Sequence, residues 1–238
     1  MSTHLIQGRK VAMPVQIRRA AVASAMFAVP AGTAQQIIDY SGLQVLRPLP
    51  GRAICSLAFV RYVDGDLGPY HEFAVAFLVR DPLGGSGPGR NVGVFIHWLP
   101  VDQGFTLEAG RSIWGFPKLM AELPLDLDGA VRRCAVRVDG QLVAAVAIRP
   151  GLPVPTRGAA PEVVAFSCLD GVTRRVPWSV RPEGVRFRPG GAVVRVGDPA
   201  GHPVADELHR LGLHRARALS STTAAQVRMT FHDAQPLG

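Results

Sequence analysis

Lysine is almost absent from this chain: Lys10 and Lys118 are the only lysines among its 26 lysine and arginine residues. A general preference for arginine explains the shortage, but an arginine would supply the same charge at position 118. A primary amine, unlike a guanidinium, can lose its proton and attack a carbonyl carbon. Lys118 lies in an apolar stretch, which disfavours its charged form. The exception at 118 therefore indicates amine chemistry, with a lysine stem resting on apolar surface as the alternative.

Cysteine and metal-binding patterns are also scarce. Cys55, Cys134 and Cys168 are an odd number and form no CxxC pair, which argues against a disulfide framework and against a zinc knuckle. We expect them to be small core residues in a reducing compartment. The seven histidines show neither HxxH nor HExxH spacing, so we predict no metal site.

Long apolar runs are missing as well. No segment approaches the roughly 20 apolar residues that a membrane helix needs, so we predict no membrane partner. Arg18 and Arg19 precede an alanine-rich stretch that faintly resembles a twin-arginine export signal. This stretch is short and ends at Pro30, which favours a strand of the mature protein and a cytoplasmic location.

Acidic residues are outnumbered, and the formal net charge is +8. Such a balance is typical of nucleic-acid-binding proteins. The arginines are scattered as pairs and single residues, however, and no basic helix or alternation of basic and aromatic residues stands out. An anionic small substrate, or solubility alone, explains the charge equally well. We therefore expect no nucleic-acid partner and keep nucleic-acid binding as a minor alternative.

The 26 glycines and 20 prolines, spread along 238 residues, indicate many turns and short strands. Two Asp-Gly pairs, Asp139-Gly140 and Asp170-Gly171, lie between apolar, β-branched segments and predict two-residue hairpins. The hairpin strands and the further expected strands cover residues 131–138, 142–148, 162–169, 173–180, 22–29, 53–63, 72–80, 91–99, 185–187, 192–196 and 216–231.

Helices are predicted to be few and short. Thr33 can cap a helix over residues 34–40, and the strongest helical segment, residues 205–211, begins near His202-Pro203. Because strands dominate, closing them into a barrel would cover the exposed sheet edges.

The remaining segments complete the predicted organisation. Residues 1–15 are expected to form a loose arm, and residues 84–89 a flexible glycine-rich loop. No linker divides the chain. We thus predict a single domain over residues 1–238 of the α+β class, dominated by antiparallel strands in closed, barrel-like sheets.

The stretch that leads to Lys118 reads Glu108-Ala109-Gly110-Arg111-Ser112-Ile113-Trp114-Gly115-Phe116-Pro117-Lys118. It resembles the active-site segment of acetoacetate decarboxylase, in which Gly-Arg-Glu is followed by three residues, an aromatic residue and Pro-Lys-Lys. The first lysine of that pattern forms a Schiff base in the family, and it corresponds to Lys118. Gly110, Arg111, Phe116 and Pro117 match the pattern as well.

A second segment supports the resemblance. Leu67-Gly68-Pro69-Tyr70-His71-Glu72 is similar to the family's Leu-Gly-x-Tyr-x-Glu, whose glutamate lies in the active site and corresponds to Glu72. Residues 202–206 weakly resemble the family's C-terminal part, so the resemblance runs from about residue 22 to residue 231. It implies the acetoacetate decarboxylase-like fold, a homo-oligomer and no cofactor.

Three positions depart from the family's pattern. Leu119 replaces the second lysine, Ser112 replaces the glutamate after Gly-Arg, and Leu57 corresponds to a further active-site glutamate. These replacements put acetoacetate itself in doubt as the substrate. The wider superfamily includes members that use the lysine for aldol condensation, dehydration or cyclisation.

The resemblance also implies roles for individual residues. Lys118 forms an iminium with a ketone or keto acid, and Glu72 moves protons. The candidates for contacting the substrate, through its carboxylate or as apolar walls, are Arg111, Arg19, Arg18, Trp114 and Phe116.

Desolvation has to replace the missing second lysine. We expect apolar neighbours, Leu119 and Met120 among them, to disfavour the ammonium form of Lys118. A helix over residues 118–122 would instead bring Glu122 onto the same face and stabilise that form. The hypothesis therefore requires Glu122 to point elsewhere.

Taken together, the residues and the resemblance predict a Schiff-base-forming carbon–carbon lyase that decarboxylates a β-keto acid. An aldolase-dehydratase or cyclase of secondary metabolism would use the same lysine. A non-catalytic small-molecule binder on the same fold is the alternative from a different class, because several family residues are replaced.

Overall fold

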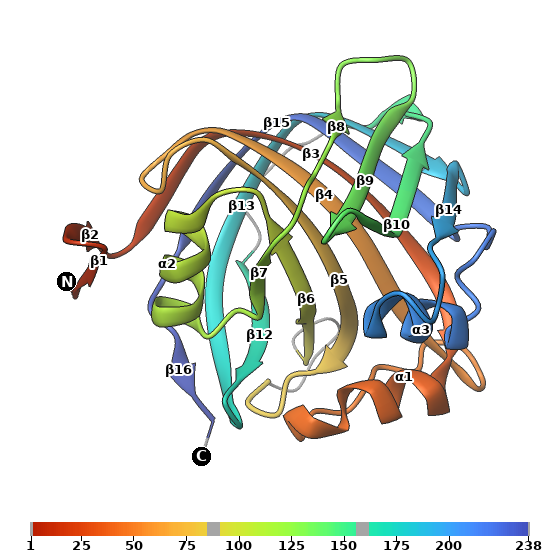
Figure 1. The fold of residues 1–238 in the computed structure, drawn as a ribbon, viewed down its shortest axis with the longest axis horizontal. Coiled ribbons are helices and arrows are strands. Elements are labelled where there is room, and N and C mark those ends of the chain that lie inside the picture. Colours follow the sequence, from red (N-terminus) through yellow and green to blue (C-terminus); the bar gives the residue numbers. More distant parts are fainter. Residues whose placement is uncertain (1, 85–90, 156–161, 238) are drawn as a thin grey trace.

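The computed structural model describes residues 2–84, 91–155 and 162–237, most of which lie in strands (Figure 1). The predicted β-dominated α+β class is confirmed. No helix in the described part of the chain is long and apolar enough to cross a membrane.

The main sheet closes on itself. Its strands pair in the order β13, β12, β6, β5, β4, β3 and β15, and β15 pairs in turn with β13. The pairings are antiparallel except that β12 runs parallel to β6. The strands are β3 (Val15–Pro30), β4 (Arg52–Gly65), β5 (Tyr70–Arg80), β6 (Val92–Val101), β12 (Glu162–Leu169), β13 (Val172–Pro189) and β15 (Ser220–Phe231). The ring confirms the barrel-like closure expected from the sequence.

Shorter strands extend this ring. β7 (Lys118–Met120) runs parallel to β6, while β11 (Leu152–Pro153) and β16 (Gln235–Pro236) pair with β13. A separate hairpin of β1 (Thr3–Ile6) and β2 (Arg9–Ala12) projects at the N-terminal end (Figure 1).

A second sheet and two helices lie on the concave side of the barrel (Figure 1). The sheet has the order β14, β10, β9 and β8, with β8 (Leu125–Asp126), β9 (Arg132–Val138), β10 (Gln141–Ile148) and β14 (Ala192–Val196). The helices are α1 (Ala31–Ile38), followed by the short helix η1 (Asp39–Ser41), and α3 (Pro203–Arg210).

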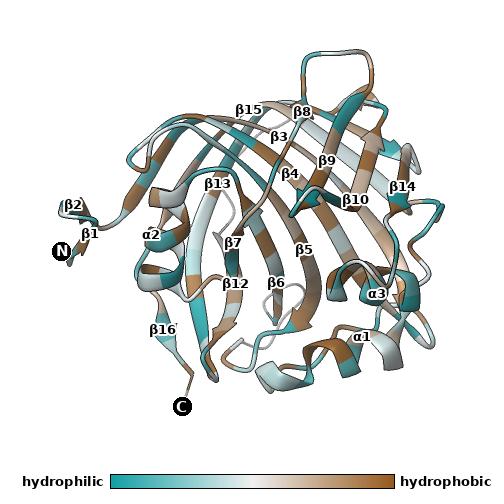
Figure 2. Cartoon of the chain, viewed as in Figure 1, coloured by the Kyte–Doolittle hydropathy of each residue, from teal (hydrophilic) through white to brown (hydrophobic). Residues whose placement is uncertain are grey.

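The buried residues form two clusters, one on each face of the barrel wall. In β4, Leu57 and Phe59 belong to the first cluster, whereas Val60 and Tyr62 belong to the second. Successive side chains of a strand point to opposite faces, so the two clusters are separated by the sheet. Figure 2 shows the long hydrophobic stretches along β4, β5 and β6 that supply both. The second cluster is covered by α2 (Gly104–Trp114), the helix that leads to Lys118.

Several local predictions are confirmed. Asp139 and Asp170 have φ angles of 49° and 53°, and the glycines after them 75° and 74°, as two-residue hairpins require. The three cysteines are buried and free. Most predicted strands agree with strands of the structure to within one residue or lie inside longer ones, but the strand expected over 216–231 begins only at Ser220. The helix expected over 205–211 is α3, which begins at Pro203.

Other local predictions were wrong. The arm at 1–15 is the β1–β2 hairpin followed by the first residue of β3. Thr33 does not cap α1, which begins directly after Pro30 and has no side-chain cap. Residues 185–187 continue β13 rather than forming a separate strand, because β15 pairs with this half of β13. Of the glycine-rich loop, residues 85–89 lie outside the described residues.

Candidate active site

Lys118 is positioned by the end of α2 and by the strand that follows it. Gly115 ends the helix in a left-handed conformation, with a φ of 63°, and its N–H donates to the carbonyl of Arg111. The left-handed conformation favours glycine. Lys118 then enters β7 opposite Leu99 of β6. The helix, the turn and the parallel pairing together point the lysine side chain back under α2.

The amine of Lys118 is buried among polar partners. Only 3% of the residue is exposed, and its Nζ lies 2.8 Å from Oε2 of Glu72 and 3.0 Å from Oγ1 of Thr106. It also lies 4.9 Å from the centre of the Tyr70 ring, within cation–π range. The stem passes so close to α2 that a Cβ at Gly110 would lie 2.5 Å from Cδ. The amine therefore has one tightly defined position.

Glu72 connects the lysine to a pair of tyrosines. Its Oε1 accepts a hydrogen bond of 2.8 Å from the hydroxyl of Tyr62, whose ring stacks on Tyr70 at 4.2 Å between centres. Burial, and to a lesser extent the charge of Glu72, raises the pKa of both phenols well above its usual value. Both tyrosines therefore keep their protons, and Tyr62 acts as a permanent donor to Glu72.

A hollow of about 440 Å³ lies against the two tyrosines, and His71, Asp102 and Gln103 contribute to its walls. Tyr62 and Tyr70 belong both to this wall and to the surroundings of the amine and its carboxylate partner. A molecule in the hollow that is to reach Nζ therefore has to displace or pass the stacked rings.

The structure brings Glu72 and Lys118 together, whereas the predicted arginines Arg111 and Arg18 bind other groups. Nη1 of Arg111 donates to the backbone carbonyl of Lys118 at 3.2 Å, while its side chain is exposed. Arg18 is exposed and bound to Asp64 and Asp66.

Of the remaining predicted residues, Arg19 is exposed, whereas the two aromatic residues are buried. Trp114 is buried and donates from Nε1 to the carbonyl of His232 at 2.8 Å, and its ring packs against Phe116 at 5.9 Å. The two aromatic rings belong to the second cluster, which is the apolar environment around the site.

The structure shows which face of the sheet the residues that depart from the family's pattern occupy. Leu119 packs against the first cluster, on the opposite face of the sheet from Lys118, and Met120 is 48% exposed. The expectation that these two side chains desolvate the amine was therefore wrong. Leu57 also belongs to the first cluster, so a glutamate at this position would not face Lys118.

Glu122 does not approach the amine of Lys118, as the hypothesis of a neutral lysine requires. Residues 118–120 form a strand rather than a helix, and Glu122 is exposed. Its backbone pairs with that of Arg137 in β9. Its carboxylate does not contact Lys118.

Sequence reasoning missed Thr106 and Tyr62. The segment 104–114 was not predicted as a helix, although Thr106, Ala109, Gly110 and Ile113 have the helical spacing of a buried face. Tyr62 pairs directly with Tyr70 across β4 and β5. The turn predicted after residues 53–63 would have indicated a hairpin between these two strands, with the two rings side by side.

Comparison with known proteins agrees with this architecture. A sequence model of the family described as acetoacetate decarboxylase (ADC) matches residues 6–234. A solved acetoacetate decarboxylase from Legionella pneumophila is similar with a TM-score of 0.70 and 15% identity, over 95% of this chain and 88% of that one. No protein with a curated description matches the sequence.

Two further solved structures are similar. An acetoacetate decarboxylase-like enzyme from Sphingomonas wittichii RW1 has a TM-score of 0.69 and 13% identity, over 100% of this chain and 99% of that one. The enduracididine biosynthesis enzyme MppR complexed with pyruvate has a TM-score of 0.67 and 18% identity, over 96% and 91%. These likenesses show the fold, and the family model spans nearly the whole chain. The chain belongs to the acetoacetate decarboxylase family.

Proposed function

We propose that the chain is a lyase that decarboxylates a small β-keto acid through a Schiff base on Lys118. The observation that supports this reaction is the buried amine held between Glu72 and Thr106. A lysine placed in a core for packing alone would not need a dry site with a proton acceptor 2.8 Å from its nitrogen. Such an arrangement suits a nucleophile whose proton has a defined destination.

The resting ion pair becomes reactive by moving one proton. Transfer from the ammonium of Lys118 to Glu72, across the 2.8 Å between the two groups, leaves a neutral amine beside a neutral carboxylic acid. The amine then forms a bond to the carbonyl carbon, and the carbonyl oxygen leaves as water with one proton from the amine and the proton on Glu72. Glu72 is then a carboxylate again, beside the iminium cation that it stabilises.

Decarboxylation follows from the iminium. The electron pair of the carbon–carbon bond to the carboxylate moves toward the positive nitrogen, CO2 leaves and an enamine remains. Protonation of the enamine carbon and attack by water on the resulting iminium release the ketone and restore Lys118. Tyr62 keeps its hydrogen bond to Glu72 throughout and so holds the carboxylate in position. Arg111, whose guanidinium already lies at the lysine backbone, is our candidate for the substrate carboxylate.

One observation favours a second reaction on the same lysine. Arg18 is held by two aspartates, and Arg111 is directed to a backbone carbonyl. A site with so little free positive charge also suits an aldol condensation, in which the enamine attacks an aldehyde. One structure of MppR, similar to this chain at 17% identity, is complexed with the condensation product of pyruvate and imidazole 4-carboxaldehyde. We keep this aldolase-type reaction as the alternative, and a homo-oligomer as the assembly.

Borohydride trapping tests the proposal. The chain is incubated with acetoacetate, acetone or pyruvate, reduced with borohydride and mapped by mass spectrometry. Because Lys10 is the only other lysine, it serves as an internal control for non-specific labelling. The matched variant is Lys118→Arg, which keeps the charge and removes the primary amine. We expect an adduct on Lys118 that is lost in the variant while labelling of Lys10 is unchanged.

The outcomes separate the reactions. Release of CO2 from acetoacetate supports the decarboxylase, and consumption of an added aldehyde without CO2 supports the aldolase. An equal extent of labelling on Lys10 and Lys118, or none with any of the carbonyl compounds, contradicts both and leaves the non-catalytic binder.

A further inference from the structure

The outer face of the second sheet has an unusual composition. Along β9, β10 and β14 the inward side chains Cys134, Val136, Val146, Ile148 and Val194 are buried in the first cluster. Because neighbouring side chains alternate between the faces, the residues between them point outward. These outward residues are small or are arginines, and Arg133, Arg149 and Arg195 are all exposed.

The strand register aligns two of the arginines across this face. Arg133 of β9 is paired with Ala147 of β10, and Ala147 is paired with Val193 of β14. Val193 in turn forms a bridge with Arg217. Cross-strand partners lie on one face of a sheet, so the row consists of two guanidinium groups that flank a floor of alanine and valine. Val193 is 61% exposed, which confirms that this floor is open.

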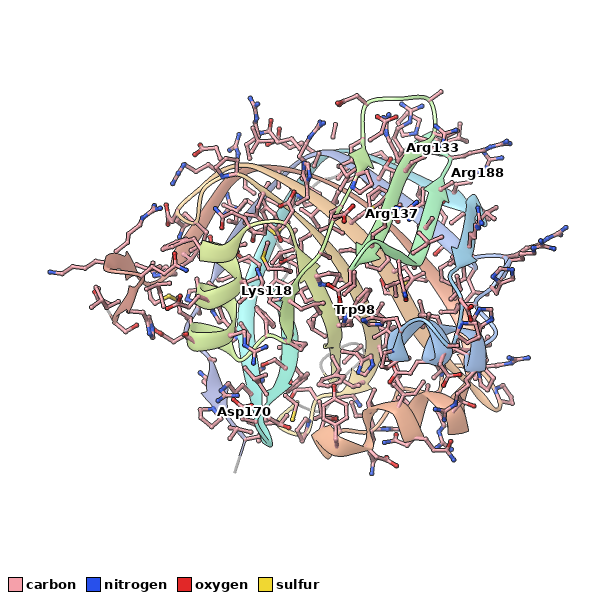
Figure 3. The ribbon with its side chains drawn as sticks, in the orientation of Figure 1. Trp98, Lys118, Arg133, Arg137, Asp170 and Arg188 are labelled. Carbon is pink, nitrogen blue, oxygen red and sulfur yellow. The ribbon has the colours of Figure 1, made fainter. Side chains whose placement is uncertain are left out.

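Two further arginines reach the same place through a glycine turn. Gly190 and Gly191 join β13 to β14 with φ angles of 67° and 82°. The carbonyl of Gly191 accepts a hydrogen bond from the backbone of Arg149 at 2.8 Å. A Cβ at Gly191 would lie 2.8 Å from Cδ of Arg188, so the glycine makes room for that side chain. Figure 3 shows Arg133 and Arg188 near each other at one corner of the molecule, away from Lys118.

These four arginines surround a hollow of about 570 Å³. No carboxylate lines it, and within the described residues none of the four makes a side-chain ion pair. Asp126 is paired with Arg133 across β8 and β9, close enough for the two charges to attract. Its carboxylate already accepts hydrogen bonds of 2.9 Å from two backbone N–H groups, those of Asp128 and Gly129. Asp126 therefore offsets part of the charge of Arg133, whereas Arg149, Arg188 and Arg217 have no carboxylate partner among the described residues.

The side chains that line the hollow indicate the class of ligand that it can bind. Guanidinium groups bind phosphate in a bidentate manner, and four of them need more than one anionic centre. The volume lies in the range of small-molecule sites, roughly 300–1,000 Å³. No aromatic side chain lines the hollow, so it lacks the stacking surface on which proteins hold single-stranded nucleic acid. We propose that this hollow binds a small ligand that carries two or more phosphate groups, at a site separate from Lys118.

Calorimetric titration with inorganic pyrophosphate tests the site. The titration is performed at constant ionic strength, with orthophosphate and sulfate as ligands that have a single anionic centre. We expect one pyrophosphate per chain, bound at least tenfold more tightly than orthophosphate. The variant Arg133→Gln/Arg217→Gln removes both ends of the row. Charge-assisted hydrogen bonds contribute enough that this variant should weaken binding by about a hundredfold.

A second pair of arginines provides the matched control. Arg47 and Arg80 line a different hollow of about 460 Å³, and the variant Arg47→Gln/Arg80→Gln removes the same total charge. We expect it to change pyrophosphate binding by less than threefold. Thermal unfolding of both double variants checks that each is folded.

Three results would overturn the proposal. Equal binding of pyrophosphate and orthophosphate, or equal weakening in the two double variants, indicates a general charge effect. Tighter binding of a labelled single-stranded oligonucleotide, with steep salt dependence and loss in Arg133→Gln/Arg217→Gln, indicates a nucleic-acid site. A change of oligomeric state by light scattering in that variant alone indicates that the face is an interface between copies of the chain.

Discussion

Replacing Gly110 by alanine separates the stability of α2 from the position of the buried amine of Lys118. A Cβ at this position would lie 2.5 Å from Cδ and 2.7 Å from Cε of Lys118. Carbon atoms in contact normally remain about 3.5–4.0 Å apart, so the lysine stem has to move by roughly 1 Å. The nitrogen at its end is bound to Glu72 and Thr106, and both contacts lengthen when the stem moves.

Two opposing effects set the change in stability. Alanine in place of a helical glycine contributes about 0.5–1 kcal/mol to the free energy of unfolding, whereas overpacking a filled core costs about 1–3 kcal/mol. The net loss is therefore between about 0 and 2.5 kcal/mol, which leaves the chain folded. The effect on the chemistry is larger, because a displacement of about 1 Å at a reactive group can cost about 100-fold in rate.

The assay is the rate of borohydride trapping on Lys118 of whichever carbonyl compound labels the parent chain, together with thermal unfolding. The matched control is Gly104→Ala in the same helix, where an added Cβ meets no atom within 4 Å. We expect Gly104→Ala to keep the parent rate and Gly110→Ala to trap about 100-fold more slowly while remaining folded. A parent-like rate in Gly110→Ala would show that the amine does not need its observed position, and the reasoning from the Glu72 contact would be refuted.

Three further predictions concern single groups. Tyr62→Phe removes the donor to Glu72, so the free energy of unfolding should fall by about 1–3 kcal/mol in chemical denaturation, and no loss would contradict the hydrogen bond of Tyr62. Lys118→Met should cost about 3–5 kcal/mol in unfolding free energy because it leaves Glu72 buried without its cationic partner. Adding Glu72→Gln should restore part of that loss; strict additivity would argue against direct coupling. Burial lowers the pKa of His202 below 6.5, and its neutral ring caps α3 by accepting from Val204 at Nδ1. This contribution to stability is complete above pH 6.5 and is lost as the pH falls toward the lower pKa of the folded state. Between pH 7.5 and 5, the unfolding free energy should therefore drop by up to about 1 kcal/mol relative to that of His202→Asn. Parallel curves of unfolding free energy against pH for the two proteins would contradict this prediction.

The sequence was most informative where a local rule determines the backbone. Asp139-Gly140 and Asp170-Gly171 predicted their hairpins because only a few residue types tolerate positive φ angles at both positions. The strands around them were recognised by alternation and β-branched residues. The length of β13 was underestimated, since this strand is extended by its pairing with β15, a partner distant in the chain. Such tertiary pairing leaves no local signal.

The candidate site was predictable to the extent that its residues lie in short motifs. Glu72 and Lys118 were identified from two separate segments, and their contact of 2.8 Å requires β5, β6 and β7 to be neighbours. Thr106 was missed because α2 has two glycines and weak hydrophobic periodicity. The orientation of Leu119 could not be predicted without knowing that residues 118–120 are a strand rather than a helix.

The arginine side chains illustrate a further limit. From the sequence, both Arg18 and Arg111 were candidates for a substrate carboxylate, because spacing along the chain does not reveal competing partners. In the fold, Asp64 and Asp66 hold Arg18. The hollow around Arg133 shows the reverse case, since four arginines scattered over 85 positions meet at one place through strand register.

The closure of the ring has a consequence for how the chain reaches this fold. Ser24 of β3 pairs with Thr222 of β15, so β3 finds this neighbour only in a strand that is synthesised much later. On the ribosome, β3 has to wait with one edge unpaired until residue 231 emerges, and contacts of such long sequence separation form slowly. An exposed strand edge of this kind invites association with other nascent chains. The second cluster, which lies around Lys118, draws on both β3 and β15, so the amine of Lys118 becomes fully enclosed only after β15 has been synthesised.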